Sequence, residues 1–175
     1  KILKRKKNLR LIDASNFTLS EILKFNSTND NILVQSEDKK MFKRNDFKIV
    51  SKKKPSISLF NDLIFAFNIC RYVKSNAIVL ASNKSTLGIG CGQTSRLDSC
   101  QIAIDKMKKF TRPSKDIVAA SDAFFPFTDG IEKLVQSGVK AVIQPAGSIK
   151  DKEVIKFANE TGTILVFSKT RHFRH

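Results

Sequence analysis

Three short segments near the end of the chain combine aromatic, acidic and cationic side chains. They are residues 121–129 (Ser-Asp-Ala-Phe-Phe-Pro-Phe-Thr-Asp), residues 144–148 (Gln-Pro-Ala-Gly-Ser) and residues 171–175 (Arg-His-Phe-Arg-His). A wall of rings bracketed by carboxylates suits a flat heterocycle with amino donors, and Arg171 could clamp a phosphate or a carboxamide. These residue types indicate a binding site for such a molecule.

Each segment also has an ordinary structural explanation. From the residues alone, the run 124–127 is better explained as a core strand that enters a turn. The alternative to a binding role for Asp129 is the cap of a following helix. The basic tail would normally be a disordered end. Two observations favour a site: Pro126 holds Phe125 extended, and only residues 168–170 separate the tail from a buried-looking strand.

A glycine-rich stretch, Gly88-Ile-Gly-Cys-Gly92, precedes Gln93, Ser95 and Arg96. It matches neither the G-x-G-x-x-G pattern after a first strand nor the G-x-x-x-x-G-K-[ST] phosphate loop, so we expect no dinucleotide site. A tight turn from a strand into a helix is the favoured explanation. Close approach of the backbone to a ligand at the helix start is the alternative.

Hydrophobic periodicity predicts the elements that must position these residues. Apolar residues recur every three or four positions from Pro55 to about Tyr72, which predicts an amphipathic helix, and helices are also expected over 95–110, 130–137 and 151–160. Strands are expected over 77–80, 86–90, 117–120, 141–143 and 164–167, with shorter ones over 9–12, 32–34 and 47–50.

Strands that alternate with helices predict an α/β fold with a mostly parallel, twisted sheet flanked by helices. In such sheets, ligands gather at the carboxyl ends of the strands. Asn76 precedes one predicted strand, and the three segments described above follow three others. The predicted fold therefore places the candidate residues at strand ends.

Composition limits the class of protein. A chain of 175 residues allows one domain with a sizeable core or two small ones. Its net charge of +16 invites a nucleic-acid function, but 24 of the 32 cations are Lys, whereas proteins that read base edges rely on Arg. Most of the 14 Phe lie in apolar runs. A lysine-rich solvated surface, which attracts anionic small substrates, is the favoured explanation.

The sequence has no apolar run of 18 residues, and no signal-peptide core follows its basic start, so we expect a cytoplasmic protein without a membrane partner. Cys70, Cys91 and Cys100 are odd in number and lack Cys-x-x-Cys spacing, which predicts reduced, mostly buried thiols and no zinc site. Because position 1 is a lysine, we expect the sequence to be the tail of a longer protein.

Five motifs in order resemble a known enzyme family. They are Ser75-Asn76, residues 88–96 (Gly-Ile-Gly-Cys-Gly-Gln-Thr-Ser-Arg), residues 120–127 (Ala-Ser-Asp-Ala-Phe-Phe-Pro-Phe), residues 141–149 (Ala-Val-Ile-Gln-Pro-Ala-Gly-Ser-Ile) and residues 171–175. Together they resemble the C-terminal half of the AICAR transformylase domain in the bifunctional AICAR transformylase/IMP cyclohydrolase family of purine biosynthesis. The run 9–12 and the helix from Pro55 are similar to the segment that precedes the motifs.

The resemblance implies a cytidine-deaminase-like α/β fold that occurs in both subdomains of a transformylase domain, with the site formed across a homodimer. It implies transfer of a formyl group from 10-formyltetrahydrofolate to the 5-amino group of the ribonucleotide AICAR. Residues 1–54 would be a basic part of this domain, and residues 55–175 its C-terminal subdomain. Nucleic acid is then not an expected partner.

The resemblance also implies roles for individual residues. Asn76 would stabilise an oxyanion; Arg96, Phe124, Arg171, Phe173 and His175 would surround the nucleotide; Leu97, Pro126, Phe127 and Asp129 would face the folate; and Asp122 would lie near a structural potassium ion. Neither His-x-Glu nor Pro-Cys-x-x-Cys occurs in the sequence, so we expect no zinc-dependent deamination.

Departures from the family pattern limit these expectations. The family's catalytic Lys-His pair, in a Lys-His-x-Asn-Pro-Cys context, and the cyclohydrolase domain do not occur in this sequence, and Thr128 replaces an expected arginine. We therefore expect half of a transformylase site, inactive by itself. The alternatives are a catalytically incomplete remnant or dimerisation module and, less favoured, a basic nucleic-acid-binding domain.

Overall fold

The computed structural model describes residue 5 and residues 8–16, 23–110 and 115–174. The chain divides into two compact units, residues 1–39 and residues 40–175. Residues 47–49 pair with a strand of the second unit, so the segment just before the first long helix packs with that unit.

The strands described in the first unit form a β-hairpin. β1 (Leu23–Thr28) pairs antiparallel with β2 (Asn31–Ser36). The strand predicted over 32–34 is confirmed as part of β2, whereas the strand predicted over 9–12 is wrong. Those residues pair with no strand of the described chain, and Ile12 is 92% exposed. This apolar run is therefore neither part of a sheet nor buried.

Among the described residues, the second unit holds a six-stranded sheet in the order β3-β8-β7-β6-β4-β5, together with four α-helices. The strands are β3 (Phe47–Ile49), β4 (Ile78–Ser82), β5 (Ser85–Gly90), β6 (Ile117–Ser121), β7 (Val139–Pro145) and β8 (Ile164–Ser168). The helices are α1 (Ile57–Cys70), α2 (Arg96–Phe110), α3 (Asp129–Gln136) and α4 (Asp151–Glu160), and the 3-10 helix η2 (Arg44–Asp46) precedes β3. The elements predicted from residue 47 onward are confirmed to within two residues at each end. Within the described part of the chain, no helix is both long and apolar enough to span a membrane.

The sheet is mixed. β6, β7 and β8 run parallel to one another, but β3, β4 and β5 run antiparallel to their neighbours. The prediction of a mostly parallel sheet is therefore wrong, although the α/β class is confirmed. Only Asn83 and Lys84 join β4 to β5, and a two-residue link makes a hairpin because a parallel pair needs a long crossover. Both residues have positive φ, and their amides donate to the buried Asp62 carboxylate over 2.9 and 2.8 Å.

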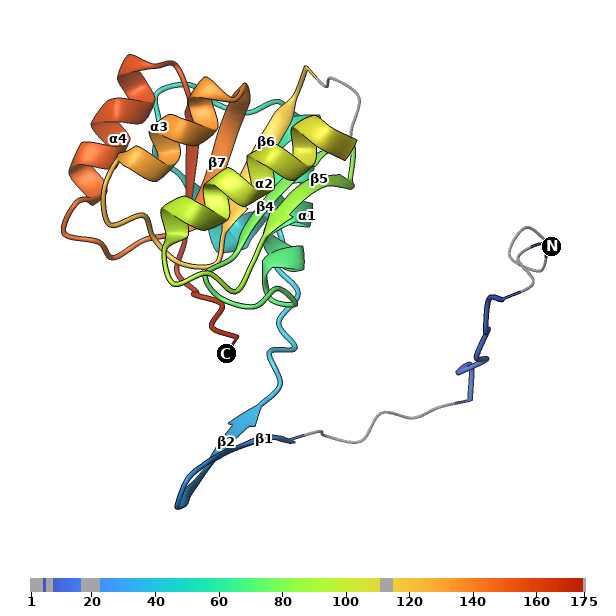
Figure 1. Ribbon diagram of the computed structural model, residues 1–175. Coiled ribbons are helices and arrows are strands. Elements are labelled where there is room, and N and C mark those ends of the chain that lie inside the picture. Colours follow the sequence, from blue (N-terminus) through green and yellow to red (C-terminus); the bar gives the residue numbers. More distant parts are fainter. Residues whose placement is uncertain (1–4, 6–7, 17–22, 111–114, 175) are drawn as a thin grey trace. The chain divides into compact units, whose positions relative to one another are not determined.

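Helices cover both faces of the sheet, with α1 on one face and α2, α3 and α4 on the other (Figure 1). Alternate residues of a strand serve the two layers. In β4, Ile78 and Leu80 pack in the core under α2, α3 and α4, whereas Val79 and Ala81 pack in the core under α1. Cover on both sides explains why every residue of β4, β6 and β8 is buried.

The ends of five strands meet at one edge of the sheet. β6, β7 and β8 finish there, at Ser121, Pro145 and Ser168. β4 begins there because its Ile78 lies opposite Ser121, and β5 ends there because Gly90 lies opposite Ile78. The segments attached to these ends carry the candidate residues, so the fold brings those segments together.

The three cysteines are free thiols, with Cys70 and Cys100 buried and Cys91 exposed. Burial raises the pKa of Cys100 to about 12 and raises the pKa of Cys70 well above its usual value. Both buried thiols therefore stay protonated at neutral pH, in agreement with the prediction of reduced, mostly buried cysteines.

The glycines of β5 allow α2 to lie directly on the strand. A Cβ added at Gly88 would lie 2.1 Å from the carbonyl oxygen of Ala103, and one at Gly90 would lie 1.9 Å from that of Ser99. The glycine-rich stretch thus serves close contact between a strand and a helix. This contact sets the position of the start of α2, where Arg96 lies.

We expect Gly90→Ala to lower the free energy of unfolding by about 1–3 kcal/mol, because the added methyl group forces α2 away from β5. Without that clash the same change would raise stability by roughly 0.5–1 kcal/mol, since glycine weakens a strand interior. Denaturant unfolding therefore tests the sign of the effect. Ser85→Ala, at the exposed start of β5, is the control and should change stability by less than about 0.5 kcal/mol.

Candidate functional site

A pocket of about 540 Å³ opens at the edge where the strand ends meet. Nine of the residues predicted for the site line it: Asn76, Arg96, Leu97, Phe124, Pro126, Phe127, Asp129, Arg171 and Phe173. They come from four separate segments of the chain, between residues 76 and 173. Asp122 lies buried beside the pocket, and His175 lies outside the described residues.

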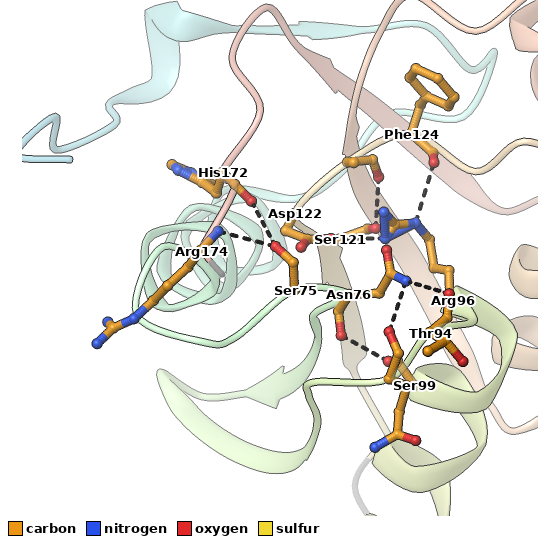
Figure 2. Close-up of polar contacts among 12 residues, drawn as sticks. Ser75, Asn76, Thr94, Arg96, Ser99, Ser121, Asp122, Phe124, His172 and Arg174 are labelled. Atoms are coloured by element: carbon orange, nitrogen blue, oxygen red, sulfur yellow. Dashed lines mark hydrogen bonds and ion pairs between the residues drawn. The ribbon is translucent and has the colours of Figure 1, made fainter. Parts of the chain in front are cut away.

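Asn76 lies just before β4, and its side-chain amide is held by the loop that follows β5 (Figure 2). Its Nδ2 donates to the carbonyl oxygens of Gln93 at 2.9 Å and Thr94 at 3.1 Å. The backbone carbonyl oxygen of Asn76 accepts a hydrogen bond from Ser99 Oγ at 2.8 Å. Both hydrogens of the amide are therefore in use, and Asn76 can donate to a bound oxyanion only if one of these bonds is exchanged.

Arg96, the first residue of α2, is fixed by two bonds to the segment after β6 (Figure 2). Its Nη1 lies 2.8 Å from Asp122 Oδ1, and its Nε donates to the Phe124 carbonyl at 3.3 Å. Burial lowers the pKa of the Arg96 guanidinium, and the charge of Asp122 opposes that shift. Within the described part of the chain, Arg96 has these two bonds, so the other N–H groups of the five-donor guanidinium are available to an anionic ligand in the pocket.

Asp122 is fully buried, and its second oxygen, Oδ2, has no hydrogen-bond partner among the described residues. The same holds for Oε1 of Gln144, which is buried in β7. Buried acceptors of this kind need a donor, a water or a cation. The described residues contain no group of three or more His, Cys, Asp or Glu that could hold a metal ion, so a potassium ion at Asp122 would also need carbonyl or hydroxyl oxygens, as hard cations do.

The run 124–127 lies outside the sheet, because β6 ends at Ser121. Its interpretation as a core strand is therefore wrong, although Phe125 does turn into the core and packs so closely on Gly130 that an added Cβ there would lie 2.6 Å from the ring. All four residues of the run border the pocket, and Phe125 is at the same time buried in the core.

Asp129 is the first residue of α3 rather than its cap. Thr128 occupies the N-cap position, and its side chain makes no capping hydrogen bond. Asp129 Oδ1 accepts from the adjacent Gly130 amide at 2.7 Å. Asp129 also lines the pocket, as Phe127 does.

The tail is held against the pocket over residues 171–174, so its interpretation as a disordered end is wrong for these residues. The His172 amide donates to the Asp122 carbonyl at 2.8 Å, and the Arg174 amide donates to Ser75 Oγ at 3.1 Å. The Arg171 guanidinium lies 4.7 Å from the centre of the Phe124 ring, a cation–π arrangement.

The pocket also has lining residues that the resemblance assigned no role: Thr94, Ser95, Ala123, Phe125 and Gly130. The sequence indicates Ser95 only as part of a helix start that a ligand could approach. The carbonyls of Gln93 and Thr94 that hold Asn76 carry no sequence signal, because any residue has a carbonyl group.

The AICARFT/IMPCHase bienzyme family model matches residues 1–106 of the chain. The chain belongs to this family. It is similar to three proteins named bifunctional purine biosynthesis protein PurH. The relative from Persephonella marina is 44% identical over 172 residues, which are 98% of this chain and 33% of the relative. The relative from Chlorobium phaeobacteroides is 44% identical over 174 residues, which are 99% of this chain and 33% of the relative. The relative from Polynucleobacter asymbioticus is 44% identical over 170 residues, which are 97% of this chain and 32% of the relative. The chain thus spans about one third of the length of these relatives.

Among solved structures, the chain is similar to a dCMP deaminase from the cyanophage S-TIM5 in apo form. The TM-score is 0.43 and the sequence identity 19%, over 65% of this chain and 98% of that chain. The cytidine-deaminase-like character of the fold stays a prediction.

We expect Asp122→Ala to lower the free energy of unfolding by about 3–5 kcal/mol, because it leaves Arg96 as a buried charge without its partner. The exposed pair of Lys140 and Asp116, 3.9 Å apart, provides the matched control. Asp116→Ala should cost less than about 1 kcal/mol. Denaturant unfolding of both variants tests the difference, and equal small losses would contradict the importance of the buried pair.

Proposed function

We propose that this chain is the C-terminal half of an AICAR transformylase domain, and that it supplies nucleotide and folate contacts for formyl transfer from 10-formyltetrahydrofolate to the 5-amino group of AICAR in purine biosynthesis. One observation carries the proposal. Nine residues to which the family resemblance gives a role, scattered between residues 76 and 173, line a single pocket. Both compact units of the chain then belong to one transformylase domain.

The nucleotide end of the pocket is cationic. Arg96 and Arg171 bring two guanidinium groups to it, and Phe124 lies beside Arg171. Guanidinium groups suit the phosphate of a nucleotide, because their donors match its oxygens in pairs. The ring of Phe124 gives a heterocycle a flat surface. The net charge of +16 attracts an anionic substrate from a distance.

The folate end is apolar with a single carboxylate. It would be formed by four of the residues that line the pocket: Leu97, Pro126, Phe127 and Asp129. A carboxylate beside apolar walls fits a heterocycle with amino donors, which the reduced folate provides. Thr128, next to these residues, lacks the charge of the arginine expected there, so the chain would bind the folate with one cationic contact fewer.

The transfer requires loss of a proton from the amine of AICAR and stabilisation of an oxyanion. This amine is a weak nucleophile because it is conjugated with the ring and the carboxamide. Asn76 would donate to the oxyanion after exchange of one of its bonds to Gln93 or Thr94, and such a donor contributes roughly 10²- to 10³-fold to the rate.

The general base would come from outside the described pocket. The His172 ring is buried, with Phe42 and Phe67 beside it, and does not line the pocket. The Lys-His pair of the resembling family would be supplied by the first transformylase subdomain, with the complete site formed in a homodimer. A potassium ion at Asp122 would neutralise its buried Oδ2.

Reconstitution tests the proposal. We expect the chain alone to show no formyl transfer from 10-formyltetrahydrofolate to AICAR, and a mixture with a first transformylase subdomain from a family member to show transfer. Transfer by the chain alone would contradict the assignment of the base to the other half. No transfer in either sample, with the chain shown to be folded, would favour a non-catalytic remnant.

In the active mixture, Asn76→Ala should lower kcat by roughly 10²- to 10³-fold, because it removes the donor to the oxyanion. Ser99→Ala is the matched control, since it removes the bond to the backbone carbonyl of Asn76 and leaves the side-chain amide of Asn76 intact. It should change kcat much less. Full turnover by Asn76→Ala would rule out its proposed role.

Arg171→Ala should weaken AICAR binding by roughly 10- to 100-fold, the effect of losing one charge-assisted contact. Arg174→Ala is the control, because Arg174 carries the same charge in the same tail but donates to the Tyr72 carbonyl and does not line the pocket. Calorimetric titration measures both. Equal losses would mean that the tail acts only through its net charge.

A further inference from the structure

Successive side chains of the tail point to opposite sides. Arg171 and Phe173 line the pocket, whereas His172 between them is only 2% exposed. In an extended segment, neighbouring side chains alternate, so a slip of one residue exchanges the two sides. Such a slip would bury Arg171 and turn His172 toward the pocket. The use of Arg171 and Phe173 therefore depends on what fixes the register of the tail.

An aromatic seat holds the His172 ring. The ring centre lies 4.6 Å from that of Phe67 in α1 and 5.2 Å from that of Phe42, and the Phe42 and Phe67 rings are 5.1 Å apart. Asn68 holds Phe42 in place, because its side chain accepts from the Phe42 amide at 2.9 Å and donates to the Phe42 carbonyl at 3.3 Å. The seat is thus built from parts of the core that are well fixed without the tail.

The backbone on either side of the ring is also tied. The His172 amide bonds to the Asp122 carbonyl at 2.8 Å. Ser75 Oγ donates to the His172 carbonyl at 3.5 Å and accepts from the Arg174 amide at 3.1 Å (Figure 2). The Ser75 amide donates to the Arg174 carbonyl at 2.8 Å. The tail therefore lies between the segment that presents Asn76 and the segment that presents Asp122.

The Arg171 guanidinium has two close neighbours. It lies over the Phe124 ring at 4.7 Å, and its Nη2 would lie 3.3 Å from a Cβ added at Gly147. Arg171 is otherwise exposed, so its place over the Phe124 ring depends on the register of the tail.

We propose that His172 is a positioning residue: its ring, seated against Phe42 and Phe67, sets the register of the tail so that Arg171 and Phe173 face the pocket. Two phenylalanine rings form the seat, so an apolar side chain of similar size should fill it. The part of the inference that concerns ligand binding rests on the proposed function. The part that concerns the register of the tail does not.

The register can be measured without a ligand. Protons of the Arg171 side chain lie over the Phe124 ring, so their NMR signals should be shifted upfield in the native chain. We expect His172→Ala to abolish this shift and His172→Leu, which refills the seat with an apolar side chain, to restore it. Retention of the shift in His172→Ala would overturn the proposal. Loss of the whole fold in His172→Ala would also overturn it, because His172 would then support the core and not the tail alone.

AICAR titration of the same variants tests the consequence for binding. His172→Ala should weaken the affinity roughly 5- to 10-fold, because an unordered Arg171 must be ordered on binding, and His172→Leu should stay within about twofold of the native chain. Loss of the upfield shift with unchanged affinity would overturn the positioning role. If the native chain binds no AICAR, alone or with the first subdomain, the proposed function fails, and the shift of Arg171 still decides whether His172 sets the register.

Discussion

The buried ion pair between Arg96 and Asp122 is the contact on which the arrangement of the pocket depends. It joins the start of α2 to the segment after β6, across 26 residues of sequence. Neither charge is stable in the core without the other, since removal of one partner leaves a buried charge uncompensated. The pair therefore fixes the distance between the start of α2 and the 122–128 segment. Arg96 and Phe124, one from each of these two segments, both line the pocket.

Asp122 extends this constraint through its backbone. Its amide donates to the Ala77 carbonyl at 3.2 Å, and its carbonyl accepts from the His172 amide. One residue thus connects the start of β4, the start of α2 and the C-terminal tail. These are the segments that carry Asn76, Arg96 and Arg171. A buried carboxylate whose side chain and backbone contact three segments explains how a pocket built from distant residues keeps a defined shape.

The direction of β4 matters as much as any side chain. In a wholly parallel sheet, the start of β4 would lie at the edge opposite the ends of β6, β7 and β8, and Asn76 would be the length of a strand away from Phe124 and Arg171. Because β4 runs antiparallel to β6, its start lies at the edge where β6 ends. The predicted fold and the predicted site were therefore incompatible in this one respect. The two-residue turn at Asn83 and Lys84, held by Asp62, resolves the conflict.

The sequence by itself determined the helices and strands of the second unit, because the 3.6-residue and two-residue periods are local and both faces of the sheet are covered. It also indicated nine of the residues that line the pocket, through five motifs in order. Only the tertiary structure decided the direction of β4, the exposed state of residues 9–12, the burial of Asp122 under Arg96, and the division of the tail between pocket and core. Each of these depends on a contact between residues far apart in the chain, such as His172 with Phe42, and no local pattern of residue types specifies which distant partner a side chain will meet.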